Sequence, residues 1–128
     1  MIDSDNLKQI NDQHGHEAGN RMLKTVARSI GGELRSTDVL ARYGGDEFIV
    51  LLPETPPERA IDVAERIRRA IETSLSEFGG ERLHTTVSIG VACYPEDGRS
   101  LDALQARADR AMYSAKQQGR NRVVRFAP

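Results

Sequence analysis

The segment Gly44-Gly45-Asp46-Glu47-Phe48 constrains the fold most, because it joins two short apolar runs at residues 39–41 and 48–52. Two strand-like runs joined this closely predict a β-hairpin whose turn displays the two acids. Glycines in such a turn permit positive φ and leave the backbone open, so a phosphate or ribose can approach while the carboxylates hold a metal ion. A solvated turn is the alternative interpretation, since Gly and Asp are ordinary turn residues. The rest of the sequence has to decide between the two.

The chain has the size and composition of one domain. Its 128 residues are 38% hydrophobic and 29% charged, so we expect a single core and no internal domain boundary. The 18 basic and 19 acidic residues give a net charge of -1, which argues against nucleic acid or an anionic membrane as a partner. Cys93 is the only cysteine, which excludes an internal disulfide and a cysteine-based zinc site, and we expect it to fill the core. No membrane segment or secretion signal is recognisable, which predicts a soluble, cytoplasmic protein.

Apolar residues at three- and four-residue intervals predict three amphipathic helices. The first covers residues 18–34. The second starts at Pro56, with Thr55 as its N-cap. The third follows an N-cap at Ser100 and ends at Gly119.

Two further strands are expected at residues 82–93 and 123–126, with a Gly-Gly loop at residues 77–81. The order of elements resembles a split β-α-β-β-α-β layout with one added helix and strand. We therefore predict an α+β fold with a mixed, mainly antiparallel central sheet flanked by helices. Only Met1 and Ile2 precede Asp3, so the first strand of that layout looks almost absent, and we interpret residues 1–128 as one N-terminally truncated domain. If they are the whole molecule, the gap in the sheet predicts poor solubility or a strand-swapped oligomer.

Residues 3–12 combine carboxylates with a lysine, which are the groups that hold a metal-bound phosphate. An EF-hand loop is the competing interpretation. It is excluded because Leu7 stands at the fifth position, Lys8 replaces the required glycine, and His14 replaces the final glutamate.

Basic residues recur near the ends of two predicted helices. His16 precedes the first helix, and Lys116 and Arg120 lie at the end of the third. Each has a purely structural explanation, because histidine can cap a helix entry and cations complement a helix C-terminus. Taken singly, these residues do not establish an anion site.

Taken together and in order, these motifs resemble the GGDEF family, the diguanylate cyclases, almost from end to end. The matching segments are Ile10-Asn11-Asp12, Gly15-His16, Gly19, the stretch from Arg42 to Phe48, Ala64 to Arg68, Val87 to Val91, Ala108-Asp109, Ala111 to Tyr113, Ala115-Lys116 and Gly119 to Asn121. The family's opening helices and most of its first strand have no counterpart. The resemblance implies a core related to nucleotide cyclase and polymerase palm folds.

The resemblance implies that two GTP molecules condense to cyclic di-GMP with release of two pyrophosphates. It implies a homodimer whose half-sites face each other, and an upstream sensor or receiver domain in the parent protein. By analogy, Asp3 and Asp46 hold magnesium, or alternatively manganese, together with the carbonyl of Ser4, and Glu47 supports this acidic cluster. Asp46 and Glu47 are the expected catalytic pair.

The resemblance also implies residues that bind substrate. Lys8, Lys116 and Arg120 match positions that hold the triphosphate, and the backbone at Gly44 and Gly45 lies against the nucleotide.

Two asparagines match positions at the guanine end of the substrate, Asn11 and Asn20. The family usually has aspartate where this chain has Asn20. Aspartate offers two acceptor oxygens to the N1–H and N2–H donors of guanine, whereas asparagine offers one. We therefore predict weaker GTP binding, by about 1 to 3 kcal/mol.

Arg35-Ser36-Thr37-Asp38 resembles the inhibitory R-x-x-D motif of the family, and Arg66 matches a secondary arginine of that site. Arginine can stack on guanine or bind phosphate, and aspartate can accept guanine donors, so the chemistry suits a product sensor. The alternative is a helix-terminal arginine with a turn aspartate.

The sequence is compatible with three functions. A cyclase with feedback inhibition is favoured, because both the acidic motif and the R-x-x-D motif are preserved. A cyclic di-GMP receptor without synthesis, and an inactive fragment acting as an interaction module, are the alternatives.

Overall fold

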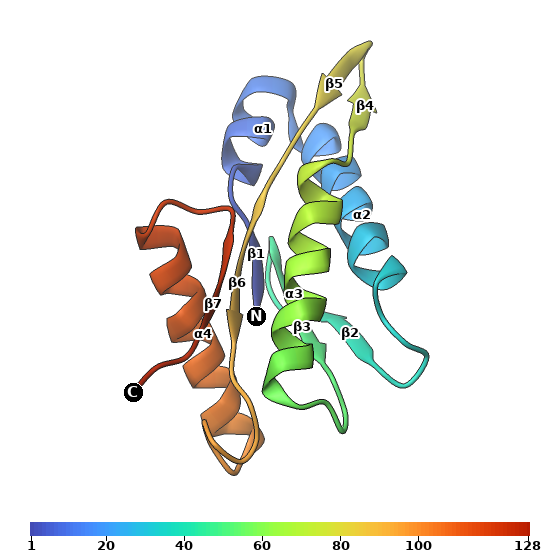
Figure 1. Cartoon of the computed structure of the whole chain (residues 1–128). Coiled ribbons are helices and arrows are strands. Elements are labelled where there is room, and N and C mark those ends of the chain that lie inside the picture. The colour runs from blue at the N-terminus through green and yellow to red at the C-terminus, as the bar shows by residue number, and fades with distance from the viewer.

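The computed structural model describes all residues from Met1 to Pro128 and consists of a central sheet, four helices and a separate small hairpin (Figure 1). The strands are β1 (Ile2–Ser4), β2 (Val39–Arg42), β3 (Glu47–Leu51), β4 (Ser76–Phe78), β5 (Glu81–Leu83), β6 (Val87–Val91) and β7 (Arg122–Arg125). The helices are α1 (Leu7–His14), α2 (His16–Gly32), α3 (Pro57–Glu72) and α4 (Leu101–Gln117). The predicted α+β class and mainly antiparallel sheet are confirmed.

The central sheet has the order β2-β3-β1-β6-β7. Strand β1 is antiparallel to both β3 and β6, and β7 is parallel to β6. The expectation of a gap in the sheet interior was wrong for these residues, because Ile2–Ser4 form that strand and pair on both sides. Three residues are enough because their neighbours satisfy the backbone groups of β1. Asp3 is therefore held at the centre of the sheet.

Alternate residues of the strands point to opposite faces of the sheet. One face packs on α1, α2 and α3 and forms the main core, to which the strands contribute Ile2, Phe48, Val87 and Ile89. Helix α4 covers the other face, beside Asp3, Glu47, Ser88 and Gly90. The polar residues of the central strands therefore gather under α4.

The contact between α4 and β6 is unusually close at Gly90. A Cβ added there would lie 2.0 Å from the carbonyl oxygen of Ala108 and 2.2 Å from the backbone nitrogen of Met112. These atoms belong to helix backbone and cannot rotate away. Only glycine therefore allows α4 to lie at this distance from the sheet.

The three predicted helices are present, with small shifts at their ends. Ser100 caps α4 by accepting a hydrogen bond from the Ala103 backbone N–H, and Gly119 follows its end with a φ of 124°, as predicted. The prediction of Thr55 as an N-cap was wrong, because α3 starts at Pro57 with Pro56 as its cap. The Thr55 hydroxyl instead donates to the carbonyl of Pro53. Helix α1 was not predicted, because only Leu7 and Ile10 in it are buried.

Two strand predictions needed correction. The expected loop at residues 77–81 contains parts of β4 and β5, which form a hairpin turning at Gly79 and Gly80, both with positive φ. The expected strand at residues 82–93 is divided into β5 and β6. The intervening residues bond to the turn after β1 instead, with the Asp5 N–H donating to the carbonyl of Thr86.

Cys93 is buried, as expected for a core residue, and burial raises the pKa of its thiol. None of the helices combines the length and the apolar character that crossing a lipid bilayer requires.

Candidate active site

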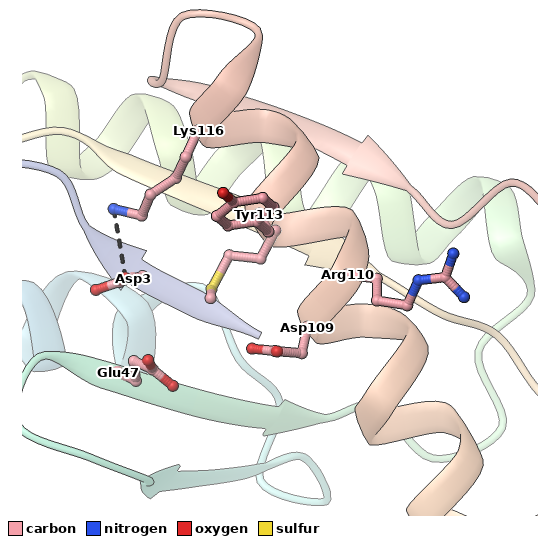
Figure 2. A pocket seen from close by; sticks show the side chains of 7 residues that line it. Asp3, Glu47, Asp109, Arg110, Tyr113 and Lys116 are labelled. Atoms are coloured by element: carbon pink, nitrogen blue, oxygen red, sulfur yellow. Dashed lines mark ion pairs between the residues drawn. The ribbon is translucent and has the colours of Figure 1, made fainter.

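An open groove of about 500 Å³ lies on the α4 face of the sheet, where α4 passes over β1 and β3 (Figure 2). The strands supply carboxylates to the groove, and α4 supplies both acidic and basic side chains. Its lining consists of Asp3, Glu47, Asp109, Arg110, Met112, Tyr113 and Lys116. The groove therefore joins two of the predicted acids, Asp3 and Glu47, to one of the predicted cations, Lys116.

The pairing of β1 with β3 brings the two acidic segments together. Asp3 is directly opposite Glu47, and the Ser4 N–H donates to the carbonyl of Asp46 at 3.3 Å. Asp46 is partly buried at the end of the hairpin turn. Residues more than forty positions apart in sequence thus meet because of the pairing of β1 with β3.

The Gly-Gly turn is open and is held by an arginine. Arg42 donates from Nε to the carbonyl of Gly44 at 3.2 Å and from Nη2 to that of Gly45 at 2.6 Å. Neither glycine has a positive φ, so the expected use of that conformation is not seen. A Cβ at Gly45 would meet no atom within 4 Å. The glycines therefore leave free space above the turn, where a ligand can approach.

Lys116 reaches from α4 to the edge of β1. Its Nζ lies 3.4 Å from Asp3 Oδ2, 3.2 Å from the Ser4 carbonyl oxygen and 3.2 Å from Asp5 Oδ1. Figure 2 shows the ion pair with Asp3. The ammonium group thus lies against two of the three groups predicted to bind a metal ion, the Asp3 carboxylate and the Ser4 carbonyl.

The Asp3 carboxylate lacks a full set of partners. Its Oδ1 is buried without a hydrogen-bond donor. Burial raises the pKa of Asp3 to about 7, the Lys116 ammonium opposes that rise, and the nearby Asp46 adds to it. A buried acceptor without a donor costs about 1 to 3 kcal/mol, so a cation bound here would relieve both the missing partner and the raised pKa.

Glu47 lies in an acidic environment. Burial raises the pKa of Glu47, and the charges of Asp109 and Asp46 raise it further. In Figure 2, Asp109 and Glu47 face the groove from α4 and β3. This concentration of negative charge favours a bound cation.

The residues present fit a hard divalent cation. Asp3, Asp46 and the Ser4 carbonyl offer oxygen ligands only, which suits magnesium or manganese. No group of three or more His, Cys, Asp or Glu side chains is arranged as a complete metal site. Magnesium is commonly held by one or two carboxylates together with substrate phosphates, so this partial set matches an ion that arrives with a nucleotide.

Asp5 lies behind the groove and was given no role from the sequence. Its side chain is only 4% exposed. Burial raises the pKa of Asp5, but hydrogen bonds from Ser88, Thr86 and the Asn121 N–H outweigh it, and the Lys116 charge assists, so the pKa is lowered overall. Asp5 is therefore a buried anion at neutral pH.

Other predicted substrate residues lie outside the groove lining. Lys8 on α1 and Arg120 after α4 are exposed. Asn11 lies against Gly19, where an added Cβ would clash with its side-chain oxygen, and that oxygen has no donor. Asn20 follows Gly19 directly in α2 and is exposed. The structure thus places Asn11 against the residue that precedes Asn20, and neither asparagine lines the groove.

The predicted inhibitory residues line a second cavity of about 410 Å³, which includes Arg35, Asp38 and Arg66. Arg35 bonds to Asp38 through Nε and Nη2, and Nη2 also donates to the Pro53 carbonyl and the Thr55 hydroxyl. The Asp38 side chain is 2% exposed, whereas that of Arg66 is 53% exposed. The guanidinium groups, rather than the carboxylate, are the accessible part of this cavity.

Sequence reasoning gave no site role to four of the residues that line the groove, Asp109, Arg110, Met112 and Tyr113. A signal was available, because Asp109, Tyr113 and Lys116 are spaced by four and three residues and therefore share one face of α4.

The comparisons with known proteins agree with this geometry. The family model described as "Diguanylate cyclase, GGDEF domain" matches residues 1–122. The chain belongs to the GGDEF domain family. It is 47% identical over 124 residues to Diguanylate cyclase A of Treponema denticola, covering 97% of this chain and 33% of that protein. It is 41% identical over 126 residues to Response regulator PleD of Caulobacter vibrioides, covering 97% of this chain and 28% of that protein.

Solved GGDEF domains have the same fold. The GGDEF domain of PA1120 (YfiN or TpbB) from Pseudomonas aeruginosa gives a TM-score of 0.94 at 39% identity, covering 99% of this chain and 80% of that one. The GGDEF domain of DgcB from Caulobacter crescentus, in complex with c-di-GMP, gives 0.89 at 33% identity, covering 97% and 74%. This GGDEF chain spans about a third or less of the length of the curated relatives named above.

Proposed function

We propose that this GGDEF domain is a diguanylate cyclase that joins two GTP molecules into cyclic di-GMP and releases two pyrophosphates. In each half-reaction the 3′-oxygen of one GTP forms a bond to the α-phosphorus of the other. The bond from that phosphorus to pyrophosphate breaks, and the 3′-hydroxyl proton is lost. The family membership and the relatives named as diguanylate cyclases support this reaction class.

The observation that carries the proposal is that Asp3 and Ser4 adjoin the Asp46 turn and also contact Lys116. Strand register places the Asp3 carboxylate and the Ser4 carbonyl beside the acidic turn, and an ammonium group already contacts both. Asp3, Asp46 and the Ser4 carbonyl would hold magnesium or manganese. When bound there, a divalent cation polarises the α-phosphate and lowers the pKa of the attacking hydroxyl.

The cationic residues bind and neutralise the triphosphate. Lys116 lies at the groove, and the exposed Lys8 and Arg120 extend from neighbouring elements toward solvent. Charge that gathers on the transferring phosphoryl group is stabilised by such preorganised cations. Glu47 keeps the environment acidic and so favours retention of the metal ion.

Catalysis requires two copies of the chain. Each nucleotide acts once as nucleophile and once as electrophile, so a twofold homodimer presents equivalent sites to both. An upstream sensor or receiver domain in the parent protein controls this pairing, in keeping with the much greater length of the relatives.

The Asn20→Asp variant is expected to bind GTP more tightly. A second acceptor oxygen would take both guanine donors, and we expect the KM for GTP to fall about tenfold, which corresponds to about 1.4 kcal/mol. Steady-state kinetics with GTP and magnesium would measure it. Inosine triphosphate, which lacks the 2-amino donor, serves as the control substrate and should show a smaller gain. An unchanged KM for GTP would contradict the assignment of Asn20 to the guanine end.

Product inhibition is assigned to the cavity of Arg35 and Arg66, with Asp38 holding Arg35 in place. The Arg35→Ala variant should need at least about tenfold more cyclic di-GMP for half-inhibition, because the ligand loses a charged, forked donor. Its uninhibited rate should stay near that of the parent. Arg69→Ala is the matched control, since Arg69 lies on α3 outside this cavity. Equal inhibition of parent and Arg35→Ala would remove this cavity from the proposal.

The proposal as a whole is tested by incubating the chain with GTP and magnesium and identifying the products by chromatography with mass detection. Cyclic di-GMP is the expected product. A chain that makes none but still binds cyclic di-GMP, and loses that binding in Arg35→Ala, would instead be a receptor.

A further inference from the structure

Asp5 connects the segment that carries Asp3 and Ser4 to Lys116 on α4 and to the turn after α4. It follows Asp3 and Ser4 directly in the chain, yet it does not line the groove. Its carboxylate is buried and contacts β6, the residue before β6, α4 and the turn after α4. No other carboxylate of the site reaches all of these segments.

Both Asp5 oxygens are fully engaged. Oδ1 accepts from Ser88 Oγ at 2.6 Å and from Lys116 Nζ at 3.2 Å. Oδ2 accepts from Thr86 Oγ1 at 2.6 Å and from the Asn121 N–H at 3.1 Å. A carboxylate has about four lone-pair positions, so this one has none left for a cation or a substrate.

Two of these four partners matter for nucleotide binding. Lys116 is the groove cation that contacts Asp3 and Ser4. Asn121 adjoins Arg120, and both residues have positive φ, 48° and 65°, which non-glycine residues rarely adopt. The bond from Asp5 to the Asn121 N–H therefore holds in place the strained turn that carries Arg120.

We propose that Asp5 is a positioning residue, which holds Lys116 and the Arg120 turn in register with Asp3 and Ser4 so that the cations meet the phosphates of a nucleoside triphosphate. It contacts neither metal nor substrate itself. The role of Asp5 in catalysis rests on the proposed cyclase function, whereas its role in holding Lys116 and the Arg120 turn rests on the contacts alone.

Asparagine at this position gives a selective perturbation. Its amide nitrogen takes the place of one carboxylate oxygen. That nitrogen then faces either Ser88 and Lys116 or Thr86 and the Asn121 N–H, all of which donate to Asp5. The hydroxyls of Ser88 and Thr86 can rotate and accept, but the Lys116 ammonium and the Asn121 N–H can only donate. Either orientation of the amide therefore breaks one of the two contacts that the proposal concerns.

Thr86→Val is the matched control. It removes one hydroxyl donor to Asp5 but leaves the contacts with Lys116 and the Asn121 N–H in place. If Asp5 only joined β1 to β6, Asp5→Asn and Thr86→Val would behave alike. The positioning role predicts that only Asp5→Asn affects the cations.

The first measurement is proton exchange at the lysine ammonium groups, by nuclear magnetic resonance of isotope-labelled lysine side chains. The chain has three lysines, and Lys8 and Lys24 are exposed internal references. We expect slow exchange at Lys116 in the parent and in Thr86→Val, and faster exchange or a shifted signal in Asp5→Asn. The parental spectrum tests the inference even if Asp5→Asn does not fold, because exchange at Lys116 as fast as at Lys8 would overturn it.

The second measurement is steady-state kinetics with GTP and magnesium. We expect Asp5→Asn to raise the KM for GTP about tenfold, with kcat reduced less, and Thr86→Val to stay within about twofold of the parent. An unaltered KM in Asp5→Asn, or an equal change in Thr86→Val, would overturn the positioning role. If the parent makes no cyclic di-GMP, the proposed function fails. The positioning role of Asp5 is then still tested by the lysine spectra and by the affinity for a non-hydrolysable GTP analogue, since neither measurement requires turnover.

Discussion

Replacing Gly90 by alanine is expected to lower the free energy of unfolding by about 3 kcal/mol or more, enough to unfold much of a marginally stable domain. The new methyl group would lie 2.0 Å from the Ala108 carbonyl oxygen and 2.2 Å from the Met112 nitrogen. Helix α4 would have to move away from β6, and Lys116 would move with it. Denaturant unfolding followed by circular dichroism measures the loss.

Gly31→Ala is the control for that experiment. An added Cβ at Gly31 meets no atom within 4 Å, and the residue lies in α2 without a positive φ. Alanine there should be neutral or stabilising by about 0.5 to 1 kcal/mol, because it has the higher helix propensity. Equal stability of Gly90→Ala and the parent would show that α4 does not pack this closely on β6.

Replacing Asp46 by alanine is expected to reduce the rate of cyclic di-GMP formation by at least about a thousandfold, or about 4 kcal/mol of transition-state stabilisation. The side chain is one of the oxygen ligands proposed for the metal ion. Asp46 is only partly buried at a turn, so thermal unfolding should change little. The measurement is product formation from GTP and magnesium, resolved by chromatography with mass detection.

Asp102→Ala controls for the loss of one negative charge, since Asp102 is exposed in the first turn of α4 and does not line the groove. It should retain nearly the parental rate. Substantial cyclic di-GMP from Asp46→Ala would remove Asp46 from the metal site and leave Asp3 as its main carboxylate.

Local signals in the sequence were reliable where a helix or hairpin carries its own pattern. The apolar spacing, the Ser100 cap and the Gly119 stop define α4 without reference to the rest of the chain. The acidic hairpin was likewise predicted to within one residue at each strand end, because its two runs adjoin in sequence.

Predictions failed where an element depends on distant partners. Strand β1 has three residues and is a strand only because β3 and β6 flank it. Helix α1 has two buried residues, too few for a clear periodicity. Thr55 has the chemistry of an N-cap, but its hydroxyl bonds to Pro53 and accepts from Arg35 instead.

The sequence by itself determined the family, the bounds of α4 between its Ser100 cap and Gly119, and the identity of the acids and cations, because these depend on residue types at short spacing. Only the tertiary structure decided that Asp3 lies opposite Glu47, that Lys116 contacts Asp3 and Ser4, and that Asp5 lies behind them. Strand register and the close packing of α4 on Gly90 set these distances, and both arise from contacts between segments far apart in the chain.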